Sequence, residues 1–400
     1  MHWLPQRNKL DSDQNDACDA CLSAILAPSP GDPLGASLGI PSRASALAPV
    51  RWVQGSAGTG KTVVLVHALR EAKRRAPNLS MVFVTYTHAL KALVADGLDD
   101  DTRRSVHVMT AHEFKNTGRN CSVLFVDEVQ DLKPDMISDL RRRCSKMVIG
   151  GDPIQTIYDE SASPEDISRI VSAQPIVLDI MYRLTRNLLA IAASIHPAAR
   201  LQDARLSRLR NVDVMLGQAE TLEQEADWVW RRAREGAQLG SPTAILLPTH
   251  KEIRNFLRRV AQLEGLDDAP FVKMKEYDEK NAVLAAAGLP LQYLGNGHGD
   301  LEDSNRRKMV YLMTYHSAKG LDFEQVYLPC LTPKLSIHYK DPDLASRLLY
   351  VAVTRAREGL FLTRTGPGLH PLVAQIPDAL FSPVAIGAEE DEESDDDVYF

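Results

Sequence analysis

Eight residues near the start of the chain, from 55 to 62, constrain its fold more than any other stretch. They read Gly-Ser-Ala-Gly-Thr-Gly-Lys-Thr and lie between a short apolar run, residues 50–53, and a helix-compatible run, residues 63–69. A strand, a glycine-rich turn and a helix in this order form the context of a phosphate-binding loop. The stretch therefore predicts an α/β fold that binds a nucleotide.

The residue types of this loop explain the expected chemistry. Gly55, Gly58 and Gly60 let the backbone turn tightly, so that successive N–H groups point at one anion. The helix that follows adds partial positive charge at its N-terminus. Lys61 is expected to reach the outer phosphates, and Thr62 to offer its hydroxyl to Mg²⁺. The loop predicts a nucleotide and a metal ion, but not the purpose they serve.

Bulk composition is that of an ordinary globular chain. Its 400 residues, 44% hydrophobic and 25% charged, suggest two or three domains. The first residues lack the apolar core of a signal peptide, and no apolar stretch is long enough to span a membrane. Five cysteines, few and odd in number, fit a reducing compartment, so we expect a cytoplasmic protein. Cys18 and Cys21 have no second pair at zinc-ligand spacing, and we interpret them as small residues of a helix.

Most of the net charge of −7 comes from one short segment. Residues 389–397 carry eight acidic side chains, and without them the formal charge of the chain becomes +1. A nearly neutral body can still carry a local basic groove, so the acidity does not exclude a nucleic-acid partner. Residues 386–400 contain too little apolar surface to pack and are expected to form a disordered tail.

Apolar runs alternate with helical stretches along most of the chain, which predicts an α/β fold with parallel sheets flanked by helices. The pattern at residues 9–26 predicts a helix capped by Asp11. Residues 27–49 are rich in Pro, Gly, Ala and Ser, which predicts a flexible connection. Residues 264–306 look rich in loops. The run at 176–178 is expected to open a second series. The runs suited to buried strands are 50–53, 81–85, 123–126, 146–149, 176–178, 244–247, 309–313, 325–328 and 360–362.

Polar residues follow two of these runs. Asp127 would lie at the C-terminal end of a strand, where parallel sheets bind ligands, and could hold a Mg²⁺ that bridges two phosphates. Glu128 is a candidate general base for a water attacking the γ-phosphate. Gln155 could sense that phosphate. Read alone, the acids could be a helix-capping turn and Gln155 part of a plain turn, but the glycine loop favours the catalytic interpretation of the acids.

Two arginines in the second half could complete such a site. Arg183 follows Met181-Tyr182, and Arg355 lies in Tyr-Val-Ala-Val-Thr-Arg-Ala-Arg, residues 350–357. An arginine delivered across a domain interface stabilises charge on a transferred phosphoryl group. From composition alone, each is better explained as a surface residue.

Taken together, these stretches resemble the motifs of the UvrD/Rep-like superfamily 1 helicases, in the order of that family. The likeness covers almost the whole chain apart from the proline-rich stretch and the tail. It implies two RecA-like P-loop domains, residues 1–176 and 177–385, with an ATP cleft between them. The similar stretches are 10–14 (Q motif), 55–62 (motif I), 83–88 (motif Ia), 108–114 (the next DNA-contacting motif), 127–131 (motif II), 151–158 (motif III), 179–183 (motif IV), 313–323 (motif V) and 348–357 (motif VI).

The resemblance also implies roles for individual residues. Gln155 would couple the nucleotide site to DNA, and Arg183 and Arg355 would be arginine fingers. Tyr86 or Tyr158 could stack on bases, which requires no sequence preference. The other implied nucleotide contacts are Gln14 and Tyr182 for the base, Thr59 and Gly320, and Asp322 for the ribose, where many relatives have Glu. The full set implied to face DNA is Tyr86, Thr87, Thr110, His112, Tyr158, Thr314 and His316.

The function implied by the resemblance is that of an ATP-dependent DNA helicase or translocase. It would move on single-stranded DNA, 3′ to 5′, with Mg²⁺-dependent ATP hydrolysis. The alternative is a DNA-sensing ATPase subunit that recruits or regulates a partner, such as a nuclease, without unwinding by itself. RNA stays open, since nothing in the sequence reads a 2′-hydroxyl.

Two departures from the family pattern favour the alternative. Only 65 residues separate Lys61 from Asp127 and 130 separate Arg183 from Thr314, so the large accessory domains of bigger relatives are expected to be absent or vestigial. Where the family continues motif III with Trp-Arg-Gly, residues 159–161 are Asp-Glu-Ser. Acids there would weaken the grip on a strand.

The acidic tail ends at Phe400. Acids followed by a terminal Phe resemble the tip of bacterial single-stranded DNA-binding proteins. The tail could dock into a basic pocket of a protein partner or fold back over the DNA groove of this chain. A tail that only aids solubility is the simpler alternative.

Overall fold

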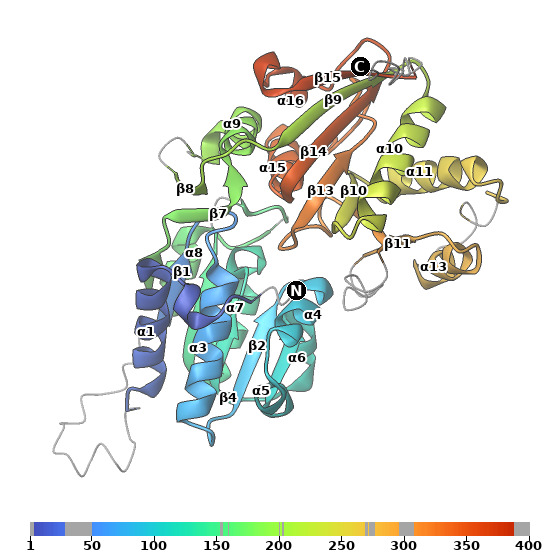
Figure 1. Cartoon of the computed structure of the whole chain (residues 1–400). Coiled ribbons are helices and arrows are strands. Elements are labelled where there is room, and N and C mark those ends of the chain that lie inside the picture. Colours follow the sequence, from blue (N-terminus) through green and yellow to red (C-terminus); the bar gives the residue numbers. More distant parts are fainter. Residues whose placement is uncertain are drawn as a thin grey trace, which may run out of the picture.

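The computed structural model describes residues 4–28, 50–152, 155–158, 160–199, 201, 204–268, 271, 277–295 and 308–387. Within these residues, the chain forms two α/β units, each built on a parallel sheet (Figure 1). The predicted fold class, α/β with parallel sheets flanked by helices, is therefore confirmed. The expected connection at 27–49 and the expected tail at 386–400 lie almost entirely outside the described residues.

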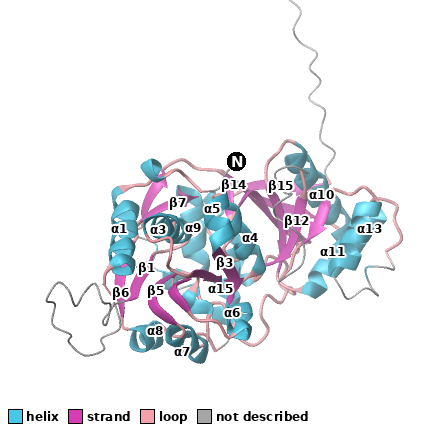
Figure 2. Ribbon diagram, turned by 90° about the horizontal axis from the view of Figure 1, so that it is seen from below, coloured by secondary structure: helices cyan, strands magenta, loops and turns pink. Residues whose placement is uncertain are grey.

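The first sheet contains six parallel strands among the described residues, in the order β3-β2-β4-β5-β1-β6. Its strands are β1 (Val50–Gln54), β2 (Met81–Thr85), β3 (Val106–Thr110), β4 (Cys121–Val126), β5 (Cys144–Gly151) and β6 (Ala173–Val177). Helices cover both faces (Figure 2): α1 (Ser12–Leu26), α3 (Lys61–Arg75) and α4 (His88–Asp96) on one, and α6 (Ala111–Thr117), α7 (Pro134–Arg142) and α8 (Pro164–Val171) on the other. The short elements η1 (Arg7–Lys9), η2 (Val129–Asp131) and α5 (Asp100–Ser105) lie between them.

The second sheet contains seven parallel strands among the described residues, in the order β11-β12-β10-β13-β14-β9-β15. Its strands are β9 (Asp213–Ala219), β10 (Thr243–Leu247), β11 (Leu291–Tyr293), β12 (Val310–Thr314), β13 (Phe323–Leu328), β14 (Ala356–Thr365) and β15 (Ser382–Ile386). One face packs on α10 (Leu222–Gln238), α11 (His250–Leu263) and α13 (Tyr277–Ala286), and the other on α9 (Arg186–Ile195), α15 (Pro342–Val353) and α16 (Pro371–Ala374). A separate parallel pair, β7 (Ile180–Thr185) and β8 (Arg205–Arg208), and the turns η4 (Pro197–Ala199) and η6 (Asp378–Leu380) complete the described elements.

Burial on both faces explains why the strands read as unbroken apolar runs rather than alternating ones. In β2, Phe83 packs with α3 on one side of the sheet, whereas Val84 packs with α6 and α7 on the other. Phe83 also stacks on Phe125 of β4, with ring centroids 6.1 Å apart. A sheet covered in this way presents only the ends of its strands to ligands, which places the polar loops at the two ends of each unit.

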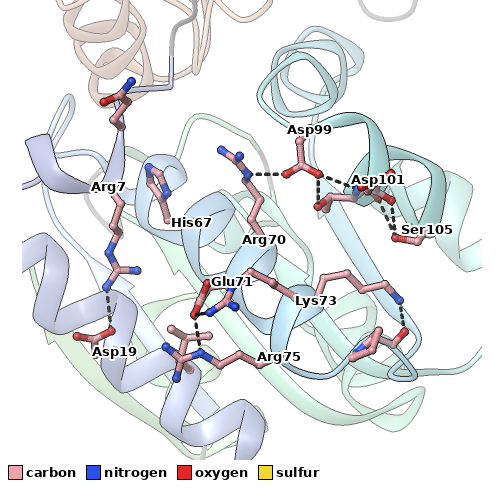
Figure 3. Close-up of a pocket in the computed structure, with 15 residues that line it drawn as sticks. Arg7, Asp19, His67, Arg70, Glu71, Lys73, Arg75, Asp99, Asp101 and Ser105 are labelled. Atoms are coloured by element: carbon pink, nitrogen blue, oxygen red, sulfur yellow. Dashed lines mark hydrogen bonds and ion pairs between the residues drawn. The ribbon is translucent and has the colours of Figure 1, made fainter.

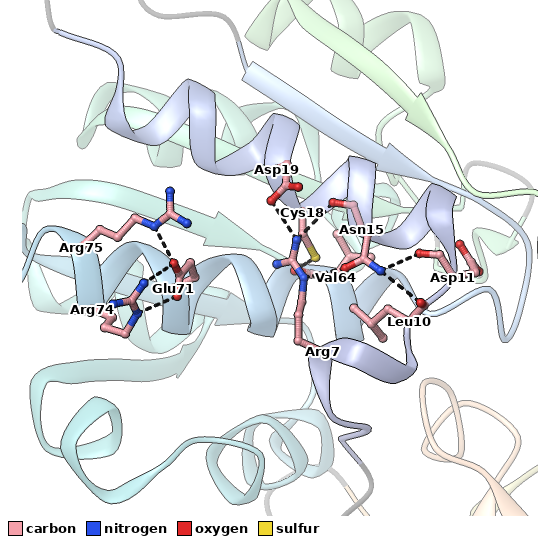
Figure 4. Close-up of polar contacts among 10 residues, drawn as sticks. All are labelled: Arg7, Leu10, Asp11, Asn15, Cys18, Asp19, Val64, Glu71, Arg74 and Arg75. Carbon is pink, nitrogen blue, oxygen red and sulfur yellow. Dashed lines mark hydrogen bonds and ion pairs between the residues drawn. The ribbon is translucent and has the colours of Figure 1, made fainter.

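The N-terminal helix is fastened to the helix that follows the glycine loop. Asp11 and Gln14 form a capping box at the start of α1, as the cap at Asp11 predicted. Arg7 donates to Asn15 and Asp19, both at 2.8 Å, which holds the preceding turn against α1 (Figure 4). His67 of α3 bonds the Pro5 carbonyl at 2.9 Å. These contacts hold the first residues of the described chain against α1 and α3, close to the glycine loop.

Cys18 and Cys21 are core residues of α1, as interpreted from the sequence. Both side chains are buried, and burial raises the pKa of each thiol to about 12. In the described part of the chain, no cluster of His, Cys, Asp and Glu could hold a metal on its own, and no helix is long and apolar enough to cross a membrane.

Three sequence expectations need correction. The run at 176–178 does not open the second series, because β6 pairs with β1 along its whole length and closes the first sheet. Residues 264–306 contain regular structure in their described part, namely α13 and β11. Strand β9 was not predicted, although it lies between β14 and β15; its apolar run Val-Met-Leu, residues 214–216, is short and is followed by Gly217 and Gln218.

Candidate functional site

The glycine loop lies between β1 and α3, as predicted, and is gripped from both sides. Gln14 donates from Nε2 to the Thr59 carbonyl at 3.0 Å, and the Tyr182 amide donates to the Gly58 carbonyl at 2.9 Å. Gly58 has φ 76°, and a Cβ there would lie 2.4 Å from Cβ of Arg183. Only glycine permits this approach, so the loop and β7 are packed backbone against backbone.

We expect Gly58→Ala to weaken nucleotide binding by about tenfold or more, which corresponds to about 1.4 kcal/mol. The added methyl group would force either the loop or Arg183 to move. Gly118→Ala is the matched control, because Gly118 has φ 65° but no neighbour within 4 Å of a built Cβ. Gly118→Ala should lose about 1–2 kcal/mol of folding stability from the left-handed backbone conformation alone, without a steric clash. Titration with a fluorescent ATP analogue measures both variants, and equal affinity for Gly58→Ala and wild type would contradict the role of this approach.

Lys61, the first residue of α3, is buried inside the loop. Its Nζ donates to the carbonyls of Gly55 and Ser56, at 2.8 and 3.1 Å. Thr59 is also buried, and its hydroxyl donates to Ser56 at 3.1 Å. The ammonium group is thus held within the loop by two carbonyls, which an anionic ligand can replace as partners.

The predicted metal-binding pair is brought together from two elements. Thr62 of α3 donates its hydroxyl to Oδ2 of Asp127, at the end of β4, over 2.6 Å. Burial and the charge of Glu128 raise the pKa of the Asp127 carboxyl above its ordinary value. A carboxylate and a hydroxyl side by side are ligands that suit Mg²⁺, and a divalent cation would favour the ionised carboxylate. The residues present therefore fit the ion.

Glu128 lies beside this pair, in a left-handed backbone conformation with φ 52°. Burial disfavours its charge, but the nearby cations Lys319 and Lys61 outweigh burial and lower the pKa of the Glu128 carboxyl. Gln130 donates to its Oε2 at 2.5 Å, which orients the group. An ionised, oriented carboxylate in this position is suited to accept a proton from a water molecule.

Arg355 is buried without a carboxylate partner among the described residues. Its guanidinium donates to the carbonyls of Val351 and Leu321, both at 2.9 Å, and to the hydroxyl of Thr354 at 3.0 Å. Burial and the like charge of Arg183 lower the pKa of Arg355 to about 9. A buried cation with neutral partners is costly, so an anion bound beside it would be strongly favoured.

Arg183 and Arg357 share one acid, Asp322. The distances to its carboxylate are 3.6 Å from Arg183 and 3.2 Å from Arg357. Arg357 was not singled out from the sequence, and its signal was only a second arginine two residues after Arg355. The carboxylate of Asp322 therefore compensates the positive charges of both arginines, in addition to any contact with a ribose.

One cavity of about 410 Å³ joins most of these groups. Both α/β units line it, so the predicted cleft between two parallel-sheet units exists. Its size suits a nucleotide. Asp127, Thr59 and Gly55 are not lining residues, whereas Lys9, Leu93 and Arg357 line the cavity but were not predicted as site residues. The predicted residues that line it are Gln14, Gly58, Gly60, Lys61, Thr62, Glu128, Gln155, Tyr182, Arg183, Gly320, Asp322 and Arg355.

A buried ion pair connects the two units beneath this cavity. Lys319, in the turn after β12, donates to Oδ1 of Asp131 at 2.7 Å, and their side chains are 2% and 1% exposed. Lys319 also donates to the Gln155 carbonyl. Gln155 in turn donates from Nε2 to Asp152 at 2.6 Å. Motifs II, III and V thus meet at one ammonium group, a connection that sequence spacing did not reveal.

Three of the residues expected to face DNA form a cluster of rings. The rings of Tyr86 and Tyr158 lie 4.3 Å apart, and those of Tyr158 and His316 lie 5.8 Å apart. They come from the end of β2, from motif III and from the turn after β12. Flat rings gathered from both units can support stacked bases.

The other residues expected to face DNA are placed differently. Thr87 and Thr110 are buried N-caps, of α4 and α6, so their hydroxyls already accept backbone N–H groups. Thr314 is buried and bonds Ser317. His112 is exposed on α6. DNA contacts by these four residues stay predictions.

Of the two acids that follow motif III, at positions 159 and 160, the structure describes only Glu160. Glu160 pairs with Lys133 on the surface, and residue 159 lies outside the described residues.

A wider groove of about 1000 Å³ lies elsewhere, between α3, α5 and the N-terminal turn (Figure 3). Its charged residues are largely paired with one another, as Arg70 is with Asp99 at 2.9 Å, so it offers few free charges to a ligand.

Two family models match the chain by sequence. One, described as an AAA domain, matches residues 42–160, and the other, described as the UvrD-like helicase C-terminal domain, matches residues 291–366. The first range contains the glycine loop and the acids after β4, and the second contains the turn after β12 and Arg355. The matched ranges therefore contain residues from both sides of the cavity.

Curated proteins match over shorter stretches. The ATP-dependent DNA helicase PcrA of Staphylococcus aureus (strain Mu50) is 31% identical over 122 residues, which are 28% of this chain and 16% of that protein. The PcrA helicase of Staphylococcus epidermidis (strain RP62A) is 31% identical over 113 residues, 26% of this chain and 15% of that protein. The matched stretch spans about one sixth of the length of these relatives.

Solved structures that match this chain include two whose names mention a helicase. One is the C-terminal domain of a possible DNA helicase from Lactobacillus plantarum, with 19% identity, a TM-score of 0.35, and coverage of 50% of this chain and 98% of that chain. The other is Arterivirus nonstructural protein 10, a helicase, with 16% identity, a TM-score of 0.43, and coverage of 82% of this chain and 62% of that chain.

Proposed function

We propose, from the premise that the chain belongs to the UvrD/Rep-like superfamily 1 helicases, that it is an ATP-dependent motor on single-stranded DNA. ATP would bind in the cavity of 410 Å³, and its hydrolysis would open and close the two units around a strand. Movement from 3′ to 5′, and strand separation, are part of the proposal. So is a division into two domains, with the boundary after Val177, where β6 of the first sheet ends, rather than at 176/177.

The observation that carries the proposal is that a buried cation, with no carboxylate partner in the described part of the chain, and a phosphate loop line one cavity. Lys61 comes from the first unit, and Arg355, with its lowered pKa, comes from the second. An anion with several negative charges would pair with both Lys61 and Arg355. If the two units closed on it, water would be excluded and each of these electrostatic contacts would become stronger. Nucleotide binding would thereby be linked to domain closure.

In this scheme each residue has a definite task. Gln14 and Tyr182, at one end of the cavity, would hold the adenine, and Asp322 and Gly320 would lie near the ribose. Lys61, Arg183 and Arg355 would bind the phosphates. Glu128 would take a proton from the attacking water. These tasks are proposed, and the distances given above support them.

Mg²⁺, if bound, would be held by Thr62 and Asp127 and would neutralise phosphate charge. We expect Thr62→Ala to raise the Mg²⁺ concentration needed for half-maximal ATP hydrolysis several-fold, because one of two protein ligands is lost. The buried hydroxyl of Thr102, which only bonds Asp99 in a helix cap, gives the control Thr102→Ala. An unchanged Mg²⁺ titration for Thr62→Ala would contradict the assigned metal site.

Two assays together test the function. ATPase activity is measured with and without single-stranded DNA or RNA, and strand separation is measured on duplexes with 3′ or 5′ tails. The proposal expects ATPase stimulation by single-stranded DNA and separation of the 3′-tailed duplex. No stimulation by either nucleic acid would overturn the motor.

A second candidate is a DNA-sensing ATPase that regulates a partner without unwinding. The observation in its favour is the small amount of structure between α4 and β3 and between α11 and β12, where the described residues form only α5, α13 and β11. Stimulation of ATPase without strand separation would select this candidate. The acidic tail ending at Phe400 is the proposed contact for such a partner, and deletion of residues 388–400 would abolish capture of the partner if this is correct.

A further inference from the structure

Tyr339 lies outside the nucleotide cavity and the ring cluster, and it is almost fully exposed. Its exposed fraction is 79%, and it is the one aromatic residue among the exposed large hydrophobic side chains of the described chain. It stands in the segment 329–341, between β13 and α15. A single exposed apolar side chain needs no explanation by itself, so the surroundings of the ring decide its meaning.

A lysine and a histidine flank this ring. Nζ of Lys340 lies 5.1 Å from the ring centroid of Tyr339, and the imidazole of His338 lies 5.9 Å away at an interplanar angle of 27°. The segment also contains Lys334. Its one acid, Asp341, caps α15 by accepting two backbone N–H groups at 2.9 and 3.1 Å. An aromatic ring with cations beside it is the combination that binds bases and phosphates together.

The backbone that presents the ring is held in place. Leu331 and Ile337 are buried in the core of the second unit. The Leu331 amide donates to the Thr363 carbonyl at 2.9 Å, and the His338 ring accepts from the Asp341 amide at 3.1 Å. Little conformational entropy would therefore be lost when a ligand binds to Tyr339.

The segment also lies near motif III. Arg347 of α15 donates to the carbonyl of Thr156 at 2.6 Å, and Thr156 is two residues before Tyr158 of the ring cluster. Tyr339 precedes Arg347 by eight residues, three of them extended and the rest helical, which limits the distance between their backbones to roughly 20 Å. One strand crossing the ring cluster could reach both places.

We propose that His338, Tyr339 and Lys340, which we call the Tyr339 platform, form a second base-stacking site for single-stranded DNA. This inference rests on the proposed function. A base would stack on the exposed ring, and Lys340 would bind a neighbouring phosphate. The platform would add grip on the second unit and would offset the acids that follow motif III on the first unit, where the family has aromatic and basic residues.

The test uses the full chain and a labelled oligothymidylate long enough to reach both ring sites. We expect Tyr339→Leu to weaken binding by fivefold to a hundredfold, the loss of one stacked base, and Tyr339→Phe to bind like the wild type, because its ring is kept. In Tyr339→Trp, the indole fluorescence should fall as the oligonucleotide binds. Basal ATPase without DNA should be unchanged in all three variants. Leu239→Ala is the control for loss of an exposed apolar side chain, since Leu239 is 81% exposed.

The outcomes separate this inference from the proposed function. If the wild type binds the oligonucleotide and Tyr339→Leu binds equally well, the platform is wrong and the motor stands. If the wild type binds no single strand, both are wrong. If Tyr339→Leu loses only the capture of a protein partner, the surface serves protein binding and the inference is overturned.

Discussion

Glu128→Gln should abolish ATP turnover while leaving ATP binding intact. Glutamine keeps the shape of the side chain and its contact with Gln130, but it cannot accept a proton from water. A general base contributes about 10²–10⁴ in rate, so we expect kcat to fall by at least about a hundredfold. Steady-state ATPase assays give kcat, and titration with a fluorescent ATP analogue gives the affinity.

The control for this variant is Glu165→Gln, which removes an exposed carboxylate from the first turn of α8. Its kcat should equal that of the wild type. If Glu128→Gln retains full turnover, Glu128 is not the base. If it loses ATP binding as well, the loss of charge has disturbed the loop, and the variant would report on Lys61 and Asp127 instead.

Lys319→Met should have the largest effect on stability and should also reduce stimulation of ATPase by DNA. It leaves Asp131 buried without its cation, and breaking a buried ion pair on one side costs about 3–5 kcal/mol. Lys319 also bonds the carbonyl of Gln155, so motif III would lose its link to the second unit. Thermal unfolding and DNA-stimulated ATPase measure the two effects.

A double variant separates stability from coupling. Asp131→Leu combined with Lys319→Met removes both charges, and we expect it to regain much of the lost stability because no buried charge stays unpaired. DNA stimulation should stay low if the ion pair couples the units. If stimulation returns with stability, the pair is only structural.

The surface pair offers a matched comparison for Lys319. Lys133 pairs with Glu160, and their side chains are 56% and 73% exposed. Exposed pairs contribute about 0–1 kcal/mol, so Lys133→Met should change the unfolding temperature little. An equal loss of stability in Lys133→Met and Lys319→Met would contradict the argument from burial.

The sequence predicted elements whose signals are local. The glycine loop, the cap at Asp11 and the apolar runs of the central strands were read correctly because each depends on neighbours a few residues apart. Strand β9 and the placement of β6 were missed, since pairing between strands is decided by the whole sheet and not by the strand's own residues. Thr87 and Thr110, expected to face DNA, are buried N-caps, a role that favours the same residue type, and their contacts with DNA stay predictions.

The sequence by itself predicted a nucleotide-binding loop at residues 55–62 with Asp127 and Glu128 near it, and the structure brings Thr62 of that loop to 2.6 Å from Asp127. Only the tertiary structure placed Lys319 on Asp131, 188 residues away, buried Arg355 without an ion-pair partner among the residues described, and presented Tyr339 to solvent. The physical reason is that charge pairing and exposure depend on which surfaces meet when two sheets close on each other. The spacing of residues along a chain predicts which side chains share a face of one helix or strand, but it does not predict which other elements pack against that face.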